Sequence, residues 1–108
     1  MSEYPAPIAD MKFVIEELAD LKQLTALPAY AEATPELVDA VLEEAGKLAT
    51  EVLGPLNRIG DTQGSRLNGD VVTTPDGWRE AYQTFVESGW GGLGGNPEFG
   101  GQGLPKLV

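Results

Sequence analysis

The chain has 108 residues, with 17 acidic and seven basic side chains, a formal net charge of −10, and neither cysteine nor histidine. A negative charge of this size repels nucleic-acid phosphates and anionic membrane surfaces, which argues against binding to either. Without cysteine or histidine the chain has no disulfide, no thiolate nucleophile, no Ser-His-Asp triad and none of the usual zinc ligands.

The length and the 42% content of hydrophobic residues suit one small domain with a modest core. No apolar run approaches the roughly 20 residues of a membrane-spanning helix. The start, Met-Ser-Glu-Tyr-Pro, also lacks the basic and apolar regions of a secretion signal. We therefore expect a cytoplasmic protein without a membrane span.

The N-terminal third predicts an arm followed by a helix. Residues 1–9 hold two prolines and are expected to be extended, with Tyr4 available for packing. Asp10 has the chemistry of an N-cap and is followed at helical spacing by Met11, Val14, Ile15 and Leu18. This pattern predicts a helix over about 10–20, and the segment before Pro28 ends any extension of it.

The clearest helix signal begins at Thr34, whose hydroxyl can cap a helix that has Pro35 at its first position. A wide apolar stripe follows, formed by Leu37, Val38, Val41, Leu42, Ala45, Leu48, Ala49, Val52 and Leu53. Glu43 and Lys47 lie mostly opposite the stripe, at i,i+4 spacing, and are expected to pair. Gly54-Pro55 predicts the end of this helix or a kink, with at most one further turn.

Residues 58–73 are polar and interrupted by glycines, which predicts a loop that contains only a small hairpin. Asn68-Gly69, between Arg66-Leu67 and Val71-Val72, is typical of a type I′ turn, here with a ladder of at most two or three residues. Asp61-Thr62-Gln63-Gly64 lacks the alternating oxygen ligands and the distal glutamate of a calcium loop. We interpret Arg58 beside Asp61 as a local ion pair or a tether of the loop.

Thr74-Pro75 repeats the hydroxyl-plus-proline opening of a helix, and Gly89 supplies its left-handed stop. The aromatic side chains at helical spacing between them form either a core or the wall of an apolar ligand site, and we favour a core. That core is expected to pack Leu37, Val41, Leu48 and Val52 against Trp78, Tyr82, Phe85 and Trp90. The pattern predicts an all-α fold of about three helices, with a long glycine-rich loop and at most a tiny β-hairpin.

Two glycine-rich stretches end the chain. Residues 89–94 match G-x-G-x-x-G formally, but they follow a predicted helix, whereas a dinucleotide fingerprint leads from a strand into a helix. Asn96–Pro105 places three glycines within four positions, so its backbone is expected to turn sharply or to lie close to another segment. Only Lys106–Val108 follow, and we interpret the chain as the first part of a longer protein. None of its residues forms an activated nucleophile or a catalytic carboxylate pair.

Four motifs in order resemble the acyl-CoA dehydrogenases. Pro97-Glu98-Phe99-Gly100-Gly101-Gln102-Gly103 is similar to the Pro-Glu-Tyr-Gly-Gly-x-Gly signature of that family. Tyr4-x-Ala6-Pro7, Pro55-Leu56-Asn57-Arg58 and Thr74-Pro75-x-Gly77-Trp78 resemble a longer subgroup, which includes 3-methylmercaptopropionyl-CoA dehydrogenase-like enzymes. The resemblance divides the chain into an N-terminal extension, residues 1–33, and the truncated beginning of the N-terminal helical domain, residues 34–108.

The resemblance implies part of an FAD-dependent oxidoreductase of fatty acid metabolism, which introduces an α,β double bond into an acyl-CoA thioester. In the family, the catalytic glutamate and most flavin contacts lie in later domains, so the resemblance implies no catalytic residue, no metal and no bound FAD for this piece alone. Its expected partners are the remaining domains, with an acyl-CoA substrate and an electron-transfer partner for the whole homo-oligomeric enzyme. The residues expected to border the acyl pocket are Phe99, Gly100, Gly101 and Gly103. The alternative is a free-standing acidic helical module that dimerises through its apolar faces and has no catalysis.

Overall fold

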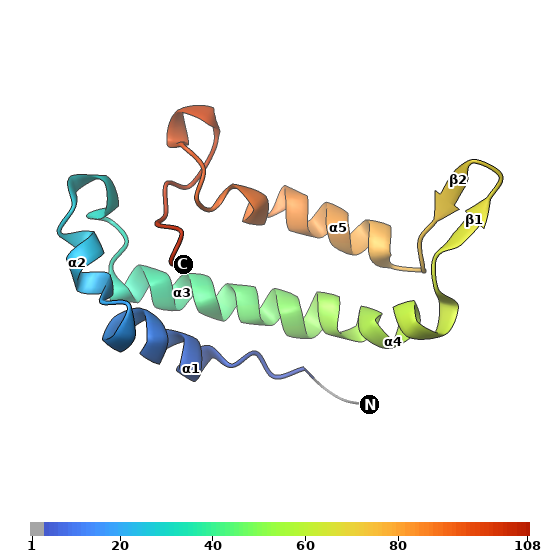
Figure 1. Ribbon diagram of the computed structural model, residues 1–108, viewed down its shortest axis with the longest axis horizontal. Coiled ribbons are helices and arrows are strands. Elements are labelled where there is room, and N and C mark those ends of the chain that lie inside the picture. Colours follow the sequence, from blue (N-terminus) through green and yellow to red (C-terminus); the bar gives the residue numbers. More distant parts are fainter. Residues whose placement is uncertain (1–3) are drawn as a thin grey trace.

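A computed structural model describes residues 4–108 (Figure 1). One long helical rod runs through the molecule, with the N-terminal segment along one side of it and α5 along the other. The radius of gyration is 17.1 Å and the extents are 53 × 35 × 18 Å. A compact domain of this length has a radius of gyration of about 13 Å, so the molecule is open and flat. The predicted all-α class with a small hairpin is confirmed.

The N-terminal segment is helical along most of its length. Helix α1 (Ile8–Phe13) continues directly into a π-helical turn, Val14–Leu18, and α2 (Leu21–Thr25) follows Asp20, which has φ 55. The predicted helix is therefore present, but it begins earlier than expected. Pro7 precedes its first turn and Asp10 lies within that turn, so the prediction of Asp10 as the N-cap was wrong. Residues 1–3 of the predicted arm lie outside the described part of the chain.

The rod consists of α3 (Pro35–Lys47), a π-helical segment (Leu48–Leu53) and α4 (Gly54–Gln63). Its start is as predicted, because the Thr34 hydroxyl accepts a hydrogen bond of 3.3 Å from the backbone N–H of Leu37. The predicted end of the helix at Gly54-Pro55 was wrong, because the chain stays helical to Gln63. The backbone N–H of Gly54 bonds to the carbonyl of Ala49, five residues back, so the hydrogen-bond ladder shifts just before the proline. This π-turn lets the helix continue past a residue that has no N–H to donate.

A two-stranded antiparallel hairpin follows the rod, formed by β1 (Arg66–Asn68) and β2 (Val71–Thr73). Its three-residue ladder is as predicted, but its turn is not of type I′. Asn68 pairs with Val71, which leaves Gly69 and Asp70 as the loop. Among the described residues, Gly69 (φ 65) has positive φ and Asp70 does not, whereas a type I′ turn needs positive φ at both positions. A glycine at the first loop position is instead typical of type II′.

Helix α5 (Trp78–Glu87) runs back along the rod. It begins after Gly77, three residues later than the predicted opening at Thr74-Pro75, and it stops at Gly89 (φ 77) as predicted. The start of α5 rests on α4, because a Cβ on Gly60 would lie 2.8 Å from Cζ2 of Trp78. The two helices are thus joined at the hairpin end of the rod.

The core lies between the N-terminal segment and α3, not between the rod and α5. Its buried members are Ile15, Leu21, Val38 and Leu42, with Ile8, Leu107 and Val108 packed against them. The predicted core was therefore wrong: Leu37 is 40% exposed and Tyr82 is 70% exposed. The apolar stripe of α3 is wide enough to offer two faces, and the N-terminal segment covers the face that carries Val38 and Leu42.

Polar contacts also hold the N-terminal segment to the rod. The Lys12 ammonium lies 3.3 Å from Asp39 and 3.5 Å from Glu43, and the Thr50 hydroxyl donates a 2.9 Å hydrogen bond to the carbonyl of Tyr4. Burial lowers the pKa of Lys12, but the hydrogen bond and the charges of these two carboxylates outweigh it and raise that pKa above 10.5. The predicted Glu43–Lys47 pair was wrong, because Lys12 takes Glu43 while Lys47 pairs with Glu44 at 2.5 Å.

Candidate functional site

The loop predicted to border a substrate pocket is a tight turn. Pro97–Phe99 form one turn of 3₁₀-helix, which the Asn96 side chain caps by accepting a 2.9 Å hydrogen bond from the N–H of Glu98. Gly100 (φ 87) and Gly103 (φ 67) occupy the left-handed region, where a side chain would be strained. The expected sharp turning of this segment is confirmed. Phe99 is 87% exposed, so its ring contacts little else in the described chain.

The same segment crosses an earlier glycine-rich stretch at backbone distance. The N–H groups of Gln102 and Leu104 donate 2.9 Å hydrogen bonds to the carbonyls of Gly92 and Leu93. A Cβ on Gly101 would overlap with the carbonyl group of Gly95, so only glycine fits at this crossing. The loop therefore holds the end of the described chain against residues 92–95, and Phe99 is its large exposed hydrophobic side chain.

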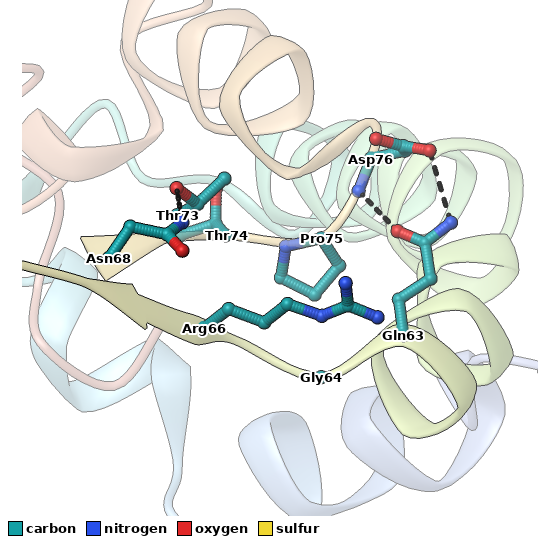
Figure 2. Close-up of a pocket in the computed structure, with 8 residues that line it drawn as sticks. All are labelled: Gln63, Gly64, Arg66, Asn68, Thr73, Thr74, Pro75 and Asp76. Carbon is teal, nitrogen blue, oxygen red and sulfur yellow. Dashed lines mark hydrogen bonds between the residues drawn. The ribbon is translucent and has the colours of Figure 1, made fainter. Parts of the chain in front are cut away.

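A polar pocket lies between the hairpin and the end of α4 (Figure 2). Its volume is about 450 Å³, and it is lined by Gln63, Gly64, Arg66, Asn68, Thr73, Thr74, Pro75 and Asp76. Gln63 accepts a 2.9 Å hydrogen bond from the backbone N–H of Asp76 and donates one of 3.0 Å to its carboxylate. These two hydrogen bonds link the end of α4 to the loop before α5, and they close the segment that contains the hairpin. The pocket offers hydrogen-bonding groups but no histidine or thiol to activate a nucleophile.

The predicted tether of this region uses other residues than expected. Arg58 and Asp61 both lie in α4, and the ion pairs found between residues 4 and 108 involve Lys12 and Lys47. The Arg58–Asp61 pair was therefore a wrong prediction, and Gln63 with Asp76 provides the tether. Periodicity could not reveal that link, because it joins the last residue of one helix to the loop before another.

An apolar groove, called here the aromatic groove, lies between α5 and the second half of the rod. It has a volume of about 370 Å³ and is lined by Leu53, Leu56, Asn57, Trp78, Ala81, Tyr82 and Phe85. Ala81 is buried, whereas Trp78 is 43% exposed and Tyr82 is more exposed still. These aromatic residues were predicted to form a core, but in the structure they face an open groove. Neither this groove nor the polar pocket includes Phe99 or its neighbouring glycines.

The formal G-x-G-x-x-G match lacks the surroundings of a dinucleotide-binding turn. The G-x-G-x-x-G match over residues 89–94 forms a 3₁₀ turn, Trp90–Gly92, after α5, so it does not lead from a strand to the helix N-terminus that would receive a pyrophosphate. Within residues 4–108, no three acidic side chains are grouped to hold a metal ion. No helix in this range combines the length and the apolar character needed to cross a bilayer.

Comparisons with known proteins place this segment in longer enzymes. No family model matches the chain. It is 44% identical over 105 residues to 3-methylmercaptopropionyl-CoA dehydrogenase of Ruegeria pomeroyi, which covers 97% of this chain but 18% of that enzyme. Two butyryl-CoA dehydrogenases of Syntrophomonas wolfei are 32% and 30% identical over 92 and 95 residues, or 82% and 84% of the chain and 15% of each enzyme. The chain thus spans less than a fifth of the length of these relatives.

Proposed function

This chain belongs to the acyl-CoA dehydrogenase family, as its motifs predicted, and we propose that it forms the beginning of the N-terminal helical domain of such an enzyme. Residues 1–33 are its N-terminal extension and residues 34–108 the first part of the domain. On this proposal the chain is not active alone. It contributes structure to a larger enzyme, whose remaining domains are its partners.

The observation that carries this proposal is the amount of apolar surface that the chain leaves open. Its buried hydrophobic residues are few, and its large exposed ones are Tyr4, Met11, Phe13, Val14, Leu18, Leu27, Leu37, Leu53, Leu67, Val71, Val72, Trp78, Tyr82, Val86 and Phe99. A monomer rarely exposes large continuous apolar patches unless they are interaction sites. The open shape and the short span relative to its relatives both favour a part whose neighbours cover these side chains.

The proposed activity of the whole enzyme is α,β-dehydrogenation of an acyl-CoA thioester with FAD, in a cytoplasmic homo-oligomer served by an electron-transfer partner. We propose that the later domains supply the catalytic glutamate and most flavin contacts, so we assign no step of that reaction to the residues of this chain. Phe99 with Gly100, Gly101 and Gly103 is proposed to border the acyl pocket of the assembled enzyme. The exposure of the Phe99 ring supports a contact with a group outside this chain.

A free-standing dimerisation module is the competing proposal, and the same exposed apolar faces would serve it. The net charge of −10 weighs against it, because two copies repel each other. The similarity to the Ruegeria pomeroyi enzyme also extends over 97% of this chain, which favours part of an enzyme over a separate module.

The proposed function is tested by exchanging segments. The homologous part of the Ruegeria pomeroyi enzyme is replaced by this chain, and the dehydrogenation of 3-methylmercaptopropionyl-CoA is measured with FAD present. We expect the chimera to retain activity, and a folded but inactive chimera would contradict the proposal. In a parallel equilibrium dialysis, the isolated chain is expected to bind no measurable FAD. Tight stoichiometric binding would overturn the division of roles between this chain and the later domains.

A further inference from the structure

The aromatic groove is preformed by contacts at one end of α5. Trp78 packs on Gly60, and Leu56 lies so close to Gly77 that a Cβ there would be 2.9 Å from its Cδ2. Gln63 fixes the residue that precedes Gly77 through the two hydrogen bonds to Asp76. These contacts hold the start of α5 at a set position on α4, so the groove does not depend on a ligand for its walls.

The residues that line the groove are uncharged and mostly apolar. Its lining contains aliphatic and aromatic side chains, with Asn57 and the Tyr82 hydroxyl as its polar groups, and no acidic or basic residue. An apolar groove between two helices can receive a third helix, which packs into it with side chains at i, i+3, i+4 and i+7.

We infer that the aromatic groove receives a helix with an aliphatic face, contributed by the part of the acyl-CoA dehydrogenase that lies outside this chain. The inference rests on the proposed function and adds to it the surface at which this segment joins the rest of the enzyme. More than four fifths of the Ruegeria pomeroyi relative lies outside the matched segment and is available to supply such a helix. A second copy is a poorer occupant, because it brings another net charge of −10 while the groove offers no basic group to offset it.

Tyr82 is the side chain with which to test this docking site. It is 70% exposed in the isolated chain, so its environment changes strongly if a helix covers it. The chimera with the Ruegeria pomeroyi enzyme and the isolated chain are both exposed to hydroxyl radicals, and the oxidation of Tyr82 is measured by mass spectrometry. We expect several-fold less oxidation of Tyr82 in the chimera. Equal oxidation in the two proteins would overturn the inference without need of any variant.

A matched pair of variants tests the energetic side. Tyr82→Asp places a carboxylate in the groove, whereas Gln83→Asp places it on the neighbouring exposed position of the same helix. In the chimera, Tyr82→Asp should lower the melting temperature by several degrees more than Gln83→Asp, because only the first carboxylate would be buried, whereas the second replaces an exposed hydrogen bond from Gln83 to Glu87. In the isolated chain the two variants should melt alike. Equal effects of the two variants in the chimera would contradict a helix over the groove.

Other occupants give distinct results. If Tyr82 is already protected in the isolated chain and light scattering shows a dimer that Tyr82→Asp dissociates, a second copy occupies the groove. If protection in the chimera appears only after an acyl-CoA is added, the occupant is an acyl chain. Either result overturns the inference. An active chimera with an exposed Tyr82 would leave the proposed function intact, and an inactive chimera with a protected Tyr82 would leave the docking site intact.

Discussion

Replacing Gly60 by alanine tests how α5 is held on the rod. The added Cβ would lie 2.8 Å from Cζ2 of Trp78 and 3.3 Å from its Cε2, so the indole ring must move away from α4. Overpacking of this kind costs about 1–3 kcal/mol. Exchanging glycine for alanine inside a helix returns about 1 kcal/mol. We therefore expect Gly60→Ala to lower the free energy of unfolding by about 0–2 kcal/mol.

Gly46→Ala is the matched control, because Gly46 also lies within the rod and gains the same helix propensity. Its nearest neighbour would be Cδ1 of Ile8 at 3.2 Å, the mobile end of a flexible side chain. Gly46→Ala should thus exceed Gly60→Ala in stability by about 1–3 kcal/mol. Urea unfolding followed by circular dichroism measures this difference, and Trp78 fluorescence in a Trp90→Phe background reports the displaced ring. Equal stabilities with an unchanged Trp78 spectrum would refute the packing of α5 on α4.

Three further predictions concern the N-terminal segment and the glycine crossing. Burial lowers the pKa of Lys12, but pairing with Asp39 outweighs burial and raises that pKa above 10.5. The stability that the protonated Lys12 contributes should therefore be complete below pH 10.5 and should be lost as the pH rises through the raised pKa. A pH series of urea unfolding should show a larger loss in the parent chain than in Lys12→Met, which keeps the Lys47–Glu44 pair and its raised Lys47 pKa, and identical profiles would contradict it. Leu21 is 1% exposed, so Leu21→Ala should cost about 2–5 kcal/mol in the same unfolding assay, and a cost below about 1 kcal/mol would remove Leu21 from the core. Gly101→Ala should abolish hydrogen-exchange protection of the amides of residues 102–104, because its Cβ overlaps with Gly95, and retained protection would disprove the crossing.

The parts of this fold that follow from short-range chemistry were predictable from the sequence. Thr34 and Pro35 indicate the start of the rod, and Gly89 indicates the end of α5. Asn68-Gly69 indicates the turn of the hairpin. In each case a local backbone requirement selects a particular residue, so no knowledge of distant contacts is needed.

The parts that depend on which surfaces meet were not predictable in this way. The apolar stripe of α3 is wide enough to pack against a partner through either of two faces. Its periodicity does not show whether the face with Val38 or the face with Leu37 is the one that becomes buried. The pairing of Lys12 with Glu43 joins two segments far apart in the sequence, so a spacing rule within one helix favoured Lys47 instead. The rod stays helical past Pro55 because a π-turn precedes this proline, and no simple sequence pattern predicts such a turn.

The candidate site also has one part that the sequence predicted and one part that it did not. The glycine motif predicted a sharp turn and a close crossing, and both are present. The open groove beside Trp78 was missed, because aromatic residues at helical spacing are usually core residues, and periodicity cannot tell a covered face from an open one.

Mixing the purified chain with a Ruegeria pomeroyi enzyme that lacks the homologous segment asks directly whether this chain completes an acyl-CoA dehydrogenase. We predict that each polypeptide alone is inactive and that dehydrogenation of 3-methylmercaptopropionyl-CoA appears when the two are combined with FAD. A mixture that remains inactive although both polypeptides are folded, or a shortened enzyme that is fully active by itself, would contradict the assignment of this chain to the N-terminal helical domain.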